Sequence, residues 1–218
     1  MPDLAHAYLE QARTKRTDHW SGPPGMVERI ARALETQPEH LVIDVGCGIG
    51  GPARRLAETV GCRVVGIDVV GDVLRIAAKR RTRGVRFVAG DAAAVPIRDA
   101  LADQVWSLGS VAHVDVAVMA SEVRRILRPG GLVAVTEVFW EGRGTPRFAE
   151  TAPRPWNAVT VSGLMSAFQS AGLVGIRALP WPGRGMGRSG ASDDPELARD
   201  LREGRLVPAL VVAERPEA

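Results

Sequence analysis

The most constraining feature of the chain is an apolar run that ends at an acid and leads into a glycine-rich turn. Residues 41–57 read LVIDVGCGIGGPARRLA, and a helical pattern follows the glycines. The run Leu41–Val45 predicts a buried parallel strand. Gly46, Gly48 and Gly50 stand at alternate positions, where the backbone can take a positive φ or approach a ligand closely. This strand, turn and helix predict the first unit of an α/β sheet that binds a nucleotide-like ligand.

The spacing of these glycines separates two kinds of binding turn. A turn that holds a pyrophosphate uses the order Gly-x-Gly-x-x-Gly. Here Asp44 precedes the first glycine, and the order is Asp-x-Gly-x-Gly-x-Gly. A carboxylate beside the turn would repel a pyrophosphate, whereas it suits a ligand that carries a cationic ammonium group.

Strands and helices alternate along most of the chain. The expected strands cover residues 41–45, 63–67, 85–89, 104–108, 132–137, 174–179 and 207–213. The expected helices cover residues 26–35, 53–60, 72–80, 114–127, 161–170 and 195–202. This alternation predicts a parallel sheet with helices on both faces, and right-handed crossovers fix its winding.

Two further segments flank or interrupt this pattern. Residues 3–16 have helical periodicity and precede a Gly-Pro-Pro-Gly hinge. We therefore expect residues 1–40 to form an N-terminal helical lid on a binding domain of residues 41–218. Residues 140–158 contain prolines and no periodicity, so they are expected to form a loop over the site.

Composition and charge exclude several classes of protein. The chain has 218 residues and no apolar run near the roughly 20 residues that span a bilayer. Its first residues do not resemble a signal peptide, so we expect a cytoplasmic protein with no membrane partner.

The net charge is +3, and the basic run Lys79–Arg83 ends an expected helix. Because cations are favourable there, we favour a solvated helix end over a nucleic-acid site.

The cysteines and acids give no sign of a metal site. Cys47 and Cys62 have no CxxC or Cys-His partner, and no acidic pair or metal-ligating cluster is visible. We expect no bound metal, and we interpret Cys47 as a small residue in a tight turn.

Three more segments follow the glycine turn in a fixed order. They are Val64–Asp68, Phe87–Ala92 and Leu127–Val133. With the turn, these segments resemble the class I S-adenosylmethionine (SAM) dependent methyltransferases over residues 41–173. The segment Gly48–Ala53 is most similar to the small-molecule branch of that family, which includes tocopherol, sterol and glycine-betaine methyltransferases and natural-product tailoring enzymes.

The resemblance implies a fold, a cofactor and a set of binding residues. The fold is an α/β, Rossmann-like, doubly wound seven-stranded sheet with its last strand antiparallel and helices on both faces. The cofactor is SAM, and the activity is methyl transfer to a small-molecule acceptor. The implied cofactor-binding residues are Asp44, Gly46, Cys47, Gly48, Gly50, Asp68, Val69, Asp91, Ala92 and Ser107.

Two of the acids also have structural interpretations. An acid about 20 residues after the turn can accept both ribose hydroxyls, and we favour this role for Asp68. The alternative is a helix N-cap, for which Asp72 is better placed. By the resemblance, Asp91 binds the adenine amino group and the N–H of Ala92 reaches the ring. An ordinary turn aspartate is the alternative for Asp91.

The acceptor side of the site is less constrained. Ser107–His113 leaves the fourth expected strand at the carboxyl edge of the sheet, where ligands bind in open α/β sheets. His113 is therefore the candidate catalytic residue, as a base or an orienting group; a capping or backbone-bonded histidine is the alternative. Glu137 either orients the substrate or ends its strand in solvent. The candidate acceptor contacts are Tyr8, His19, Trp20, Glu137 and Trp140, and core packing is the alternative for each aromatic.

The sequence favours methyl transfer to a small molecule over several alternative functions. The acceptor is expected to be an apolar or aromatic metabolite, methylated on oxygen, nitrogen or carbon. Ser107–Ser110 stands where an Asn-Pro-Pro-Tyr motif would indicate amino-methylation of DNA bases or glutamine. A nicotinamide-dependent oxidoreductase is disfavoured, because the glycine spacing differs and no Tyr-x-x-x-Lys pair exists. A non-catalytic SAM-binding module stays open, because methyl transfer by proximity needs no fixed nucleophile.

Overall fold

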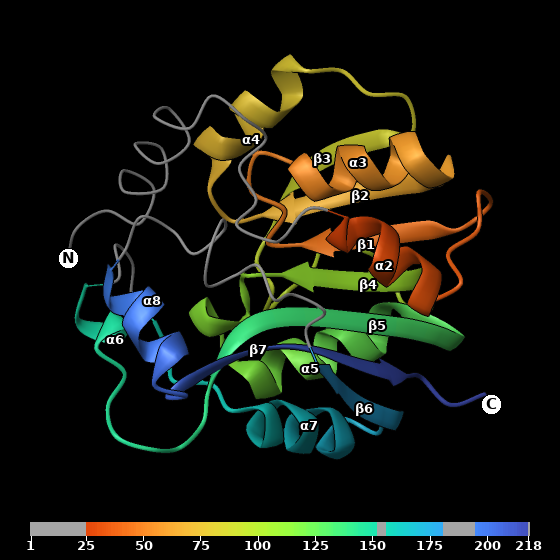
Figure 1. Ribbon diagram of the computed structural model, residues 1–218. Helices are drawn as coiled ribbons and strands as arrows, with labels where there is room; N and C mark the ends of the chain where they lie inside the picture. The colour runs from red at the N-terminus through yellow and green to blue at the C-terminus, as the bar shows by residue number, and fades with distance from the viewer. Residues whose placement is uncertain (1–24, 152–155, 181–194, 218) are drawn as a thin grey trace.

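The computed structural model describes residues 25–151, 156–180 and 195–217, which form a seven-stranded sheet with helices packed on it (Figure 1). The strands are β1 Leu41–Val45, β2 Arg63–Asp68, β3 Val85–Ala89, β4 Ala102–Leu108, β5 Leu127–Trp140, β6 Val174–Pro180 and β7 Leu206–Glu214. Their order across the sheet is β3-β2-β1-β4-β5-β7-β6. Strands β1 to β5 pair in parallel, and β7 is antiparallel to β5 and β6. The predicted sheet with an antiparallel last strand is confirmed.

Helices cover both faces of this sheet. They are α2 Met26–Ala33, α3 Gly51–Val60, α4 Gly71–Lys79, the 3-10 turn η1 Val111–His113, α5 Val116–Ile126, α6 Phe148–Thr151, α7 Val161–Ser170 and α8 Pro195–Arg202. Val42 packs in one core cluster with α2 and α3, whereas Ile43 packs in another with α5 and α7. Since successive strand residues point to opposite faces, the apolar run of β1 is buried on both sides.

The helix expected over residues 114–127 is slightly shorter in the structure, where α5 covers Val116–Ile126. The side chain of Asp115 causes this start, because its Oδ1 accepts hydrogen bonds from the N–H groups of Ala117 at 2.9 Å and Val118 at 3.2 Å. Residues 111–113 form the separate turn η1 before this helix, so His113 lies on a short turn at the sheet edge.

Strand β5 begins at Leu127, five residues before the predicted start. Ala102 pairs with Leu127, but the next pair is Gln104 with Leu132, so the intervening residues bulge from the ladder. Gly130, with φ of 69°, permits this path. Residues 128–131 therefore form a bulge inside the strand.

The segment expected to be a loop contains a short helix. Helix α6 lies within residues 140–158 and contacts α8. The N–H of Phe148 donates to the Asp200 carboxylate at 2.8 Å, and the Phe148 ring meets that of Trp156 edge-on at 6.0 Å. The prediction of an irregular segment is wrong for residues 148–151, because these tertiary contacts order a turn of helix that has no periodicity of its own.

Helix α2 is joined to the sheet by packing and by a buried polar network. Ile30 lies in the core cluster that β1 and α3 share. Gln104 of β4 accepts hydrogen bonds from Thr36 at 2.8 Å and from the Trp106 indole at 3.1 Å, and donates to the carbonyl of Leu34 at 2.8 Å.

The rest of the predicted lid, residues 1–24, lies outside the described residues. Within the described ranges, we find no helix with the length and apolar character needed to traverse a bilayer.

Candidate active site

A pocket of about 270 Å³ opens at the carboxyl ends of β1, β2 and β4 and beside the residues that follow β3. This is the edge at which the turns of an open parallel sheet bind ligands. Eight of the ten predicted cofactor-binding residues line it: Asp44, Gly46, Cys47, Asp68, Val69, Asp91, Ala92 and Ser107. Gly48 and Gly50 do not line it, and they instead shape the turn behind it. The predicted catalytic residue, His113, lines the pocket as well.

The glycine turn is held by its own N–H groups. Gly46 and Cys47 both donate to the carbonyl of Ile67, at 2.8 and 3.0 Å, and Gly50 donates to the carbonyl of Cys47 at 2.9 Å. Gly48 donates to Asp68 Oδ2 at 2.8 Å. These four donors are occupied by protein acceptors, so the turn does not offer them to a phosphate.

Two of the glycines are required by close neighbours. Gly46 has φ of 76°, and a Cβ there would lie 2.4 Å from Ser110 Oγ. Gly50 has φ of 77°, and a Cβ there would lie 2.2 Å from the Phe87 ring. Both contacts are shorter than any side chain tolerates, so these positions demand glycine for space as well as for conformation.

Asp44 is a buried carboxylate on the wall of the pocket. Its residue is 3% exposed, and neither carboxylate oxygen has a hydrogen-bond partner within the described structure. Burial, with a further contribution from the nearby Asp68 charge, raises the pKa of Asp44 from 3.8 to about 7. An orphaned carboxylate on a pocket wall is costly unless a ligand supplies a donor or a positive charge.

Asp68, at the end of β2, already makes two hydrogen bonds. Its Oδ2 accepts from Gly48 and its Oδ1 accepts from the N–H of Val70 at 2.9 Å. The expectation that Asp72 caps the next helix is wrong: α4 starts at Gly71, so Asp72 lies inside the first turn, where it pairs with Arg75. Asp68 thus ties the glycine turn to the start of α4 while its carboxylate lines the pocket.

Asp91 follows β3 and borders the pocket in a local turn. Its Oδ1 accepts from the N–H of Ala93 at 2.8 Å, and its carbonyl accepts from Ala94 at 3.0 Å. An ordinary turn aspartate makes bonds of this kind, and that was the alternative to adenine binding in the sequence analysis. They leave Asp91 exposed at the pocket wall, so the turn geometry and a ligand contact are compatible.

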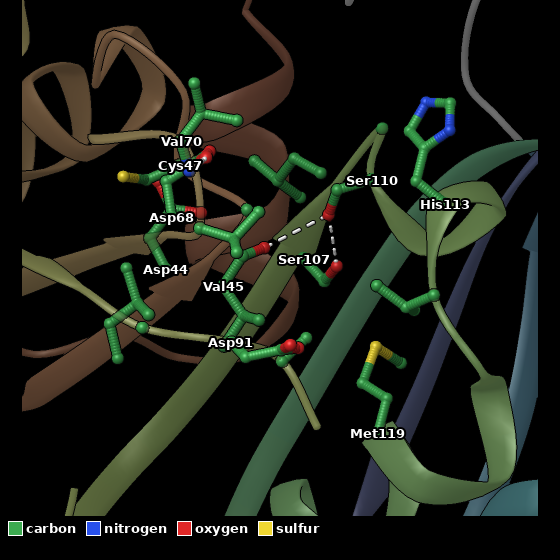
Figure 2. A pocket seen from close by; sticks show the side chains of 18 of the residues that line it. Asp44, Val45, Cys47, Asp68, Val70, Asp91, Ser107, Ser110, His113 and Met119 are labelled. Carbon is green, nitrogen blue, oxygen red and sulfur yellow. Dashed lines mark hydrogen bonds between the residues drawn. The ribbon is translucent and has the colours of Figure 1, made fainter. Parts of the chain in front are cut away.

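The other side of the pocket is formed by the segment that leaves β4 (Figure 2). Ser110 Oγ donates to the carbonyl of Val45 at 3.1 Å and lies 2.8 Å from Ser107 Oγ. His113 and Met119 lie beyond these serines, opposite the carboxylates of Asp44 and Asp68 in the view of Figure 2. The pocket therefore has an acidic side at β1 and β2 and a side with a histidine and apolar groups at η1 and α5.

Cys47 lines the pocket but is not poised to react. Its thiol is buried, and burial raises its pKa well above the ordinary range, with the Asp44 and Asp68 charges acting in the same direction. A thiol in such surroundings is a poor nucleophile. Among the side chains that the structure describes, no group of three His, Cys, Asp or Glu residues is arranged to hold a metal ion.

Two further predicted residues, Glu137 and Trp140, do not line the pocket. Glu137 accepts a hydrogen bond from the N–H of Ala112, and the Trp140 indole donates to the carbonyl of Gly144 at 2.9 Å. Tyr8, His19 and Trp20 lie outside the described residues.

The sequence analysis gave no role to the lining residues Pro52, Val70, Gly90, Ser110, Val114 and Met119. Four of them lie in segments that follow a strand, which was the available signal: Val70, Gly90, Ser110 and Val114. Pro52 and Met119 instead lie in α3 and α5.

The sheet order, the glycine turn and the acids at the ends of β1 and β2 and after β3 are those of the class I methyltransferase fold. Residues 43–135 match the family described as Methyltransferase domain. This part of the chain is therefore similar to methyltransferases, and the resemblance predicted from the sequence is confirmed. The matched segment runs from Ile43 in β1 to Val135 in β5, and it contains the residues that line the pocket.

The chain is similar to named methyltransferases over part of its length, and the name of one of them states a hydroquinone substrate. The chain is 36% identical over 123 residues to methyltransferase GfsG of Streptomyces halstedii, which is 54% of this chain and 44% of that protein. It is 38% identical over 151 residues to the 2-methyl-6-phytyl-1,4-hydroquinone methyltransferase of a Synechocystis species, which is 63% of this chain and 47% of that protein. The chain therefore spans less than half of the length of these relatives.

A solved structure supports the fold over a larger part of the chain. The geranyl diphosphate C-methyltransferase of Streptomyces coelicolor, in complex with geranyl diphosphate and S-adenosyl-L-homocysteine, superposes with a TM-score of 0.77. The alignment covers 88% of this chain and 80% of that protein at 20% identity. At this identity the likeness concerns the fold.

Proposed function

We propose that this domain binds SAM and transfers its methyl group to a small-molecule acceptor, an apolar or aromatic metabolite. The observation that carries the proposal is Asp44, a buried carboxylate on the wall of the pocket that has no hydrogen-bond partner among the described residues. A cationic ammonium group would satisfy it, whereas the phosphates of a dinucleotide would be repelled. The amino acid part of SAM carries such an ammonium group.

Three other parts of the acidic side suit the remaining groups of the cofactor. Asp68 is suited to the ribose hydroxyls, because its carboxylate lines the pocket and a carboxylate accepts about four hydrogen bonds. Asp91 and Ala92 are suited to the polar edge of the adenine. Val69 is 70% exposed beside the pocket, and an aromatic base would cover it. When bound, SAM supplies a methyl group already activated on a sulfonium.

The opposite side of the pocket would receive the acceptor. Val114 and Met119 provide an apolar surface, and His113 is the titratable side chain on that side. In this proposal His113 removes a proton from the acceptor or orients it, and the surrounding apolar groups keep water from the transfer. The proposal covers an oxygen, nitrogen or carbon acceptor, and it retains Tyr8, His19 and Trp20 as acceptor contacts.

The proposal is tested by methyl transfer from labelled SAM. The purified chain is incubated with methyl-labelled SAM and a panel of prenylated hydroquinones, sterols, prenyl diphosphates and an extract of small metabolites. We expect labelled product to accumulate with at least one acceptor, and Asp68→Ala to reduce transfer by weakening SAM binding by ~2–3 kcal/mol. Binding of SAM without transfer to any acceptor would indicate the non-catalytic alternative. Absence of SAM binding would refute the proposal.

A further inference from the structure

The turn that carries His113 is held on both sides of Ala112. The N–H of Ala112 donates to Glu137 Oε2 at 3.3 Å, and the carbonyl of Ala112 accepts the N–H of Asn157 at 2.8 Å. Ala112 is itself buried, and His113 follows it directly. Because η1 has only three residues, fixing the two peptide groups that flank Ala112 fixes the backbone from which His113 projects.

Glu137 occupies a strand position at which packing alone would favour an apolar residue. On β5, Val135 and Phe139 flank it on the same face of the sheet, and both are fully buried in the core cluster that α5 and α7 share. A carboxylate beside this core is costly unless its oxygens are hydrogen-bonded. The bonds from Ala112 and from the N–H of Val138, at 2.9 Å, compensate part of this cost, and the first of them reaches the turn that carries His113.

We infer that Glu137 is a positioning residue, whose carboxylate holds the turn η1 so that His113 faces the acceptor side of the pocket. Glu137 does not itself line the pocket, so it acts through the turn. The role in catalysis rests on the proposed methyl transfer. The role in holding the turn is independent of methyl transfer, because it depends on a hydrogen bond within the protein.

Two conservative substitutions separate geometry from charge. Glu137→Gln keeps an oxygen acceptor at the same reach and removes the charge. Glu137→Asp keeps the charge and withdraws the acceptor by one methylene. Glu141→Gln, an exposed residue just beyond β5, is the matched control for a loss of charge at this end of the strand.

Hydrogen exchange of the Ala112 amide, measured by NMR, tests the turn without reference to activity. We expect the Ala112 amide to exchange ~10-fold or more faster in Glu137→Asp than in the unmodified protein, and to stay near the unmodified rate in Glu137→Gln and Glu141→Gln. The amide of Val135, in the core of β5, reports general destabilisation and should stay protected in every variant. Unchanged Ala112 exchange in Glu137→Asp would overturn the assignment.

Turnover with labelled SAM then tests the catalytic consequence. We expect Glu137→Asp to lower kcat by ~10–100-fold through displacement of His113, with SAM affinity unchanged and Glu137→Gln within ~3-fold of the unmodified enzyme. Combined with His113→Ala, Glu137→Asp should cause no further loss, because both changes remove the same function.

The reverse order, with Glu137→Gln inactive and Glu137→Asp active, would overturn the inference and identify Glu137 as a proton acceptor. Absence of SAM binding would refute the proposed function and leave the exchange result standing.

Discussion

The hydroxyl of Ser110 occupies the space that a side chain at position 46 would need. A Cβ on Gly46 would lie 2.4 Å from Ser110 Oγ, which is itself bonded to the carbonyl of Val45. The end of β4 therefore closes against the turn after β1, and the two strands meet without a gap on this side of the pocket. Position 46 therefore requires glycine for two reasons: its backbone has a positive φ, and Ser110, more than sixty positions later in the chain, fills the space of a side chain.

Gly46→Ala should be more damaging than its positive φ alone explains. Gly109→Ala is the matched control, because Gly109 has φ of 73° and nothing within 4 Å of an added Cβ. Each substitution bears ~1–2 kcal/mol of backbone strain, and we expect Gly46→Ala to lose ~1–3 kcal/mol more through overlap with Ser110. Urea denaturation measures both. Adding Ser110→Gly to Gly46→Ala should recover most of the difference, and equal losses in the two single variants would contradict the account.

Asp44 should make the ligand-free protein less stable as the pH rises. Its pKa is raised in the folded protein from 3.8 to about 7, so the fold binds this proton more tightly than the unfolded chain does. The resulting stabilisation is present at low pH and is lost as the pH rises toward 7. Relative to Asp44→Asn, the unmodified protein should lose ~3 kcal/mol of unfolding free energy between pH 5 and pH 8.5.

Chemical denaturation at several pH values measures this difference. The substitution Glu39→Gln, at an exposed carboxylate, is the control and should change the pH dependence little. Parallel pH profiles for the unmodified protein and Asp44→Asn would show that Asp44 titrates normally. In that case the buried carboxylate could not be the feature that selects a cationic ligand.

The strands and the acidic side of the pocket could be predicted from the sequence because they depend on local chemistry. An apolar run such as Leu41–Val45 is buried wherever the sheet forms, and Asp44 and Asp68 lie at the carboxyl ends of their strands. The bulge before Leu132 and the helix α6 were not predictable in this way. They depend on tertiary partners, Ala102 and Asp200, that the local pattern does not contain.

His113 should affect turnover and leave cofactor binding nearly intact. It lines the side of the pocket across from Asp44 and Asp68. If it accepts a proton from the acceptor, His113→Ala should lower kcat by ~10²–10⁴-fold with SAM affinity unchanged. His40→Ala, at a histidine that accepts the N–H of Gln37 in the turn before β1, is the control. A loss below about tenfold would indicate catalysis by proximity, and a large loss of SAM binding would make His113 a cofactor or structural residue.

Gln104 should contribute strongly to stability although it lies far from the pocket edge. It is 1% exposed and joins Thr36, Trp106 and the carbonyl of Leu34. Gln104→Ala leaves these buried polar groups without partners, and we expect a loss of ~2–4 kcal/mol. Gln169→Ala, at an exposed position of α7, should change stability by less than ~0.5 kcal/mol. Equal effects in thermal or urea denaturation would contradict a role for the network.

The roles of Ser110 and Glu137 show where sequence reasoning stopped. The sequence analysis placed both residues near the carboxyl edge of the sheet, but the partners of their side chains come from other strands and turns. Ser110 bonds to β1, and Glu137 bonds to η1. Spacing along the chain places such residues at the correct edge of the sheet; only the pairing register and the path of each turn determine what they touch.

Isothermal titration calorimetry with SAM tests the central claim most directly, which is that the acidic side of this pocket selects a cationic cofactor. At pH 6.5, in two buffers of different ionisation enthalpy, we expect one SAM to bind per chain with a Kd of ~1–10 μM and to release a proton from Asp44, since the ammonium group favours its charged form. Asp44→Asn should bind more weakly and release no proton, and NAD should give no heat of binding. Absence of SAM binding, or binding of NAD in its place, would contradict the account.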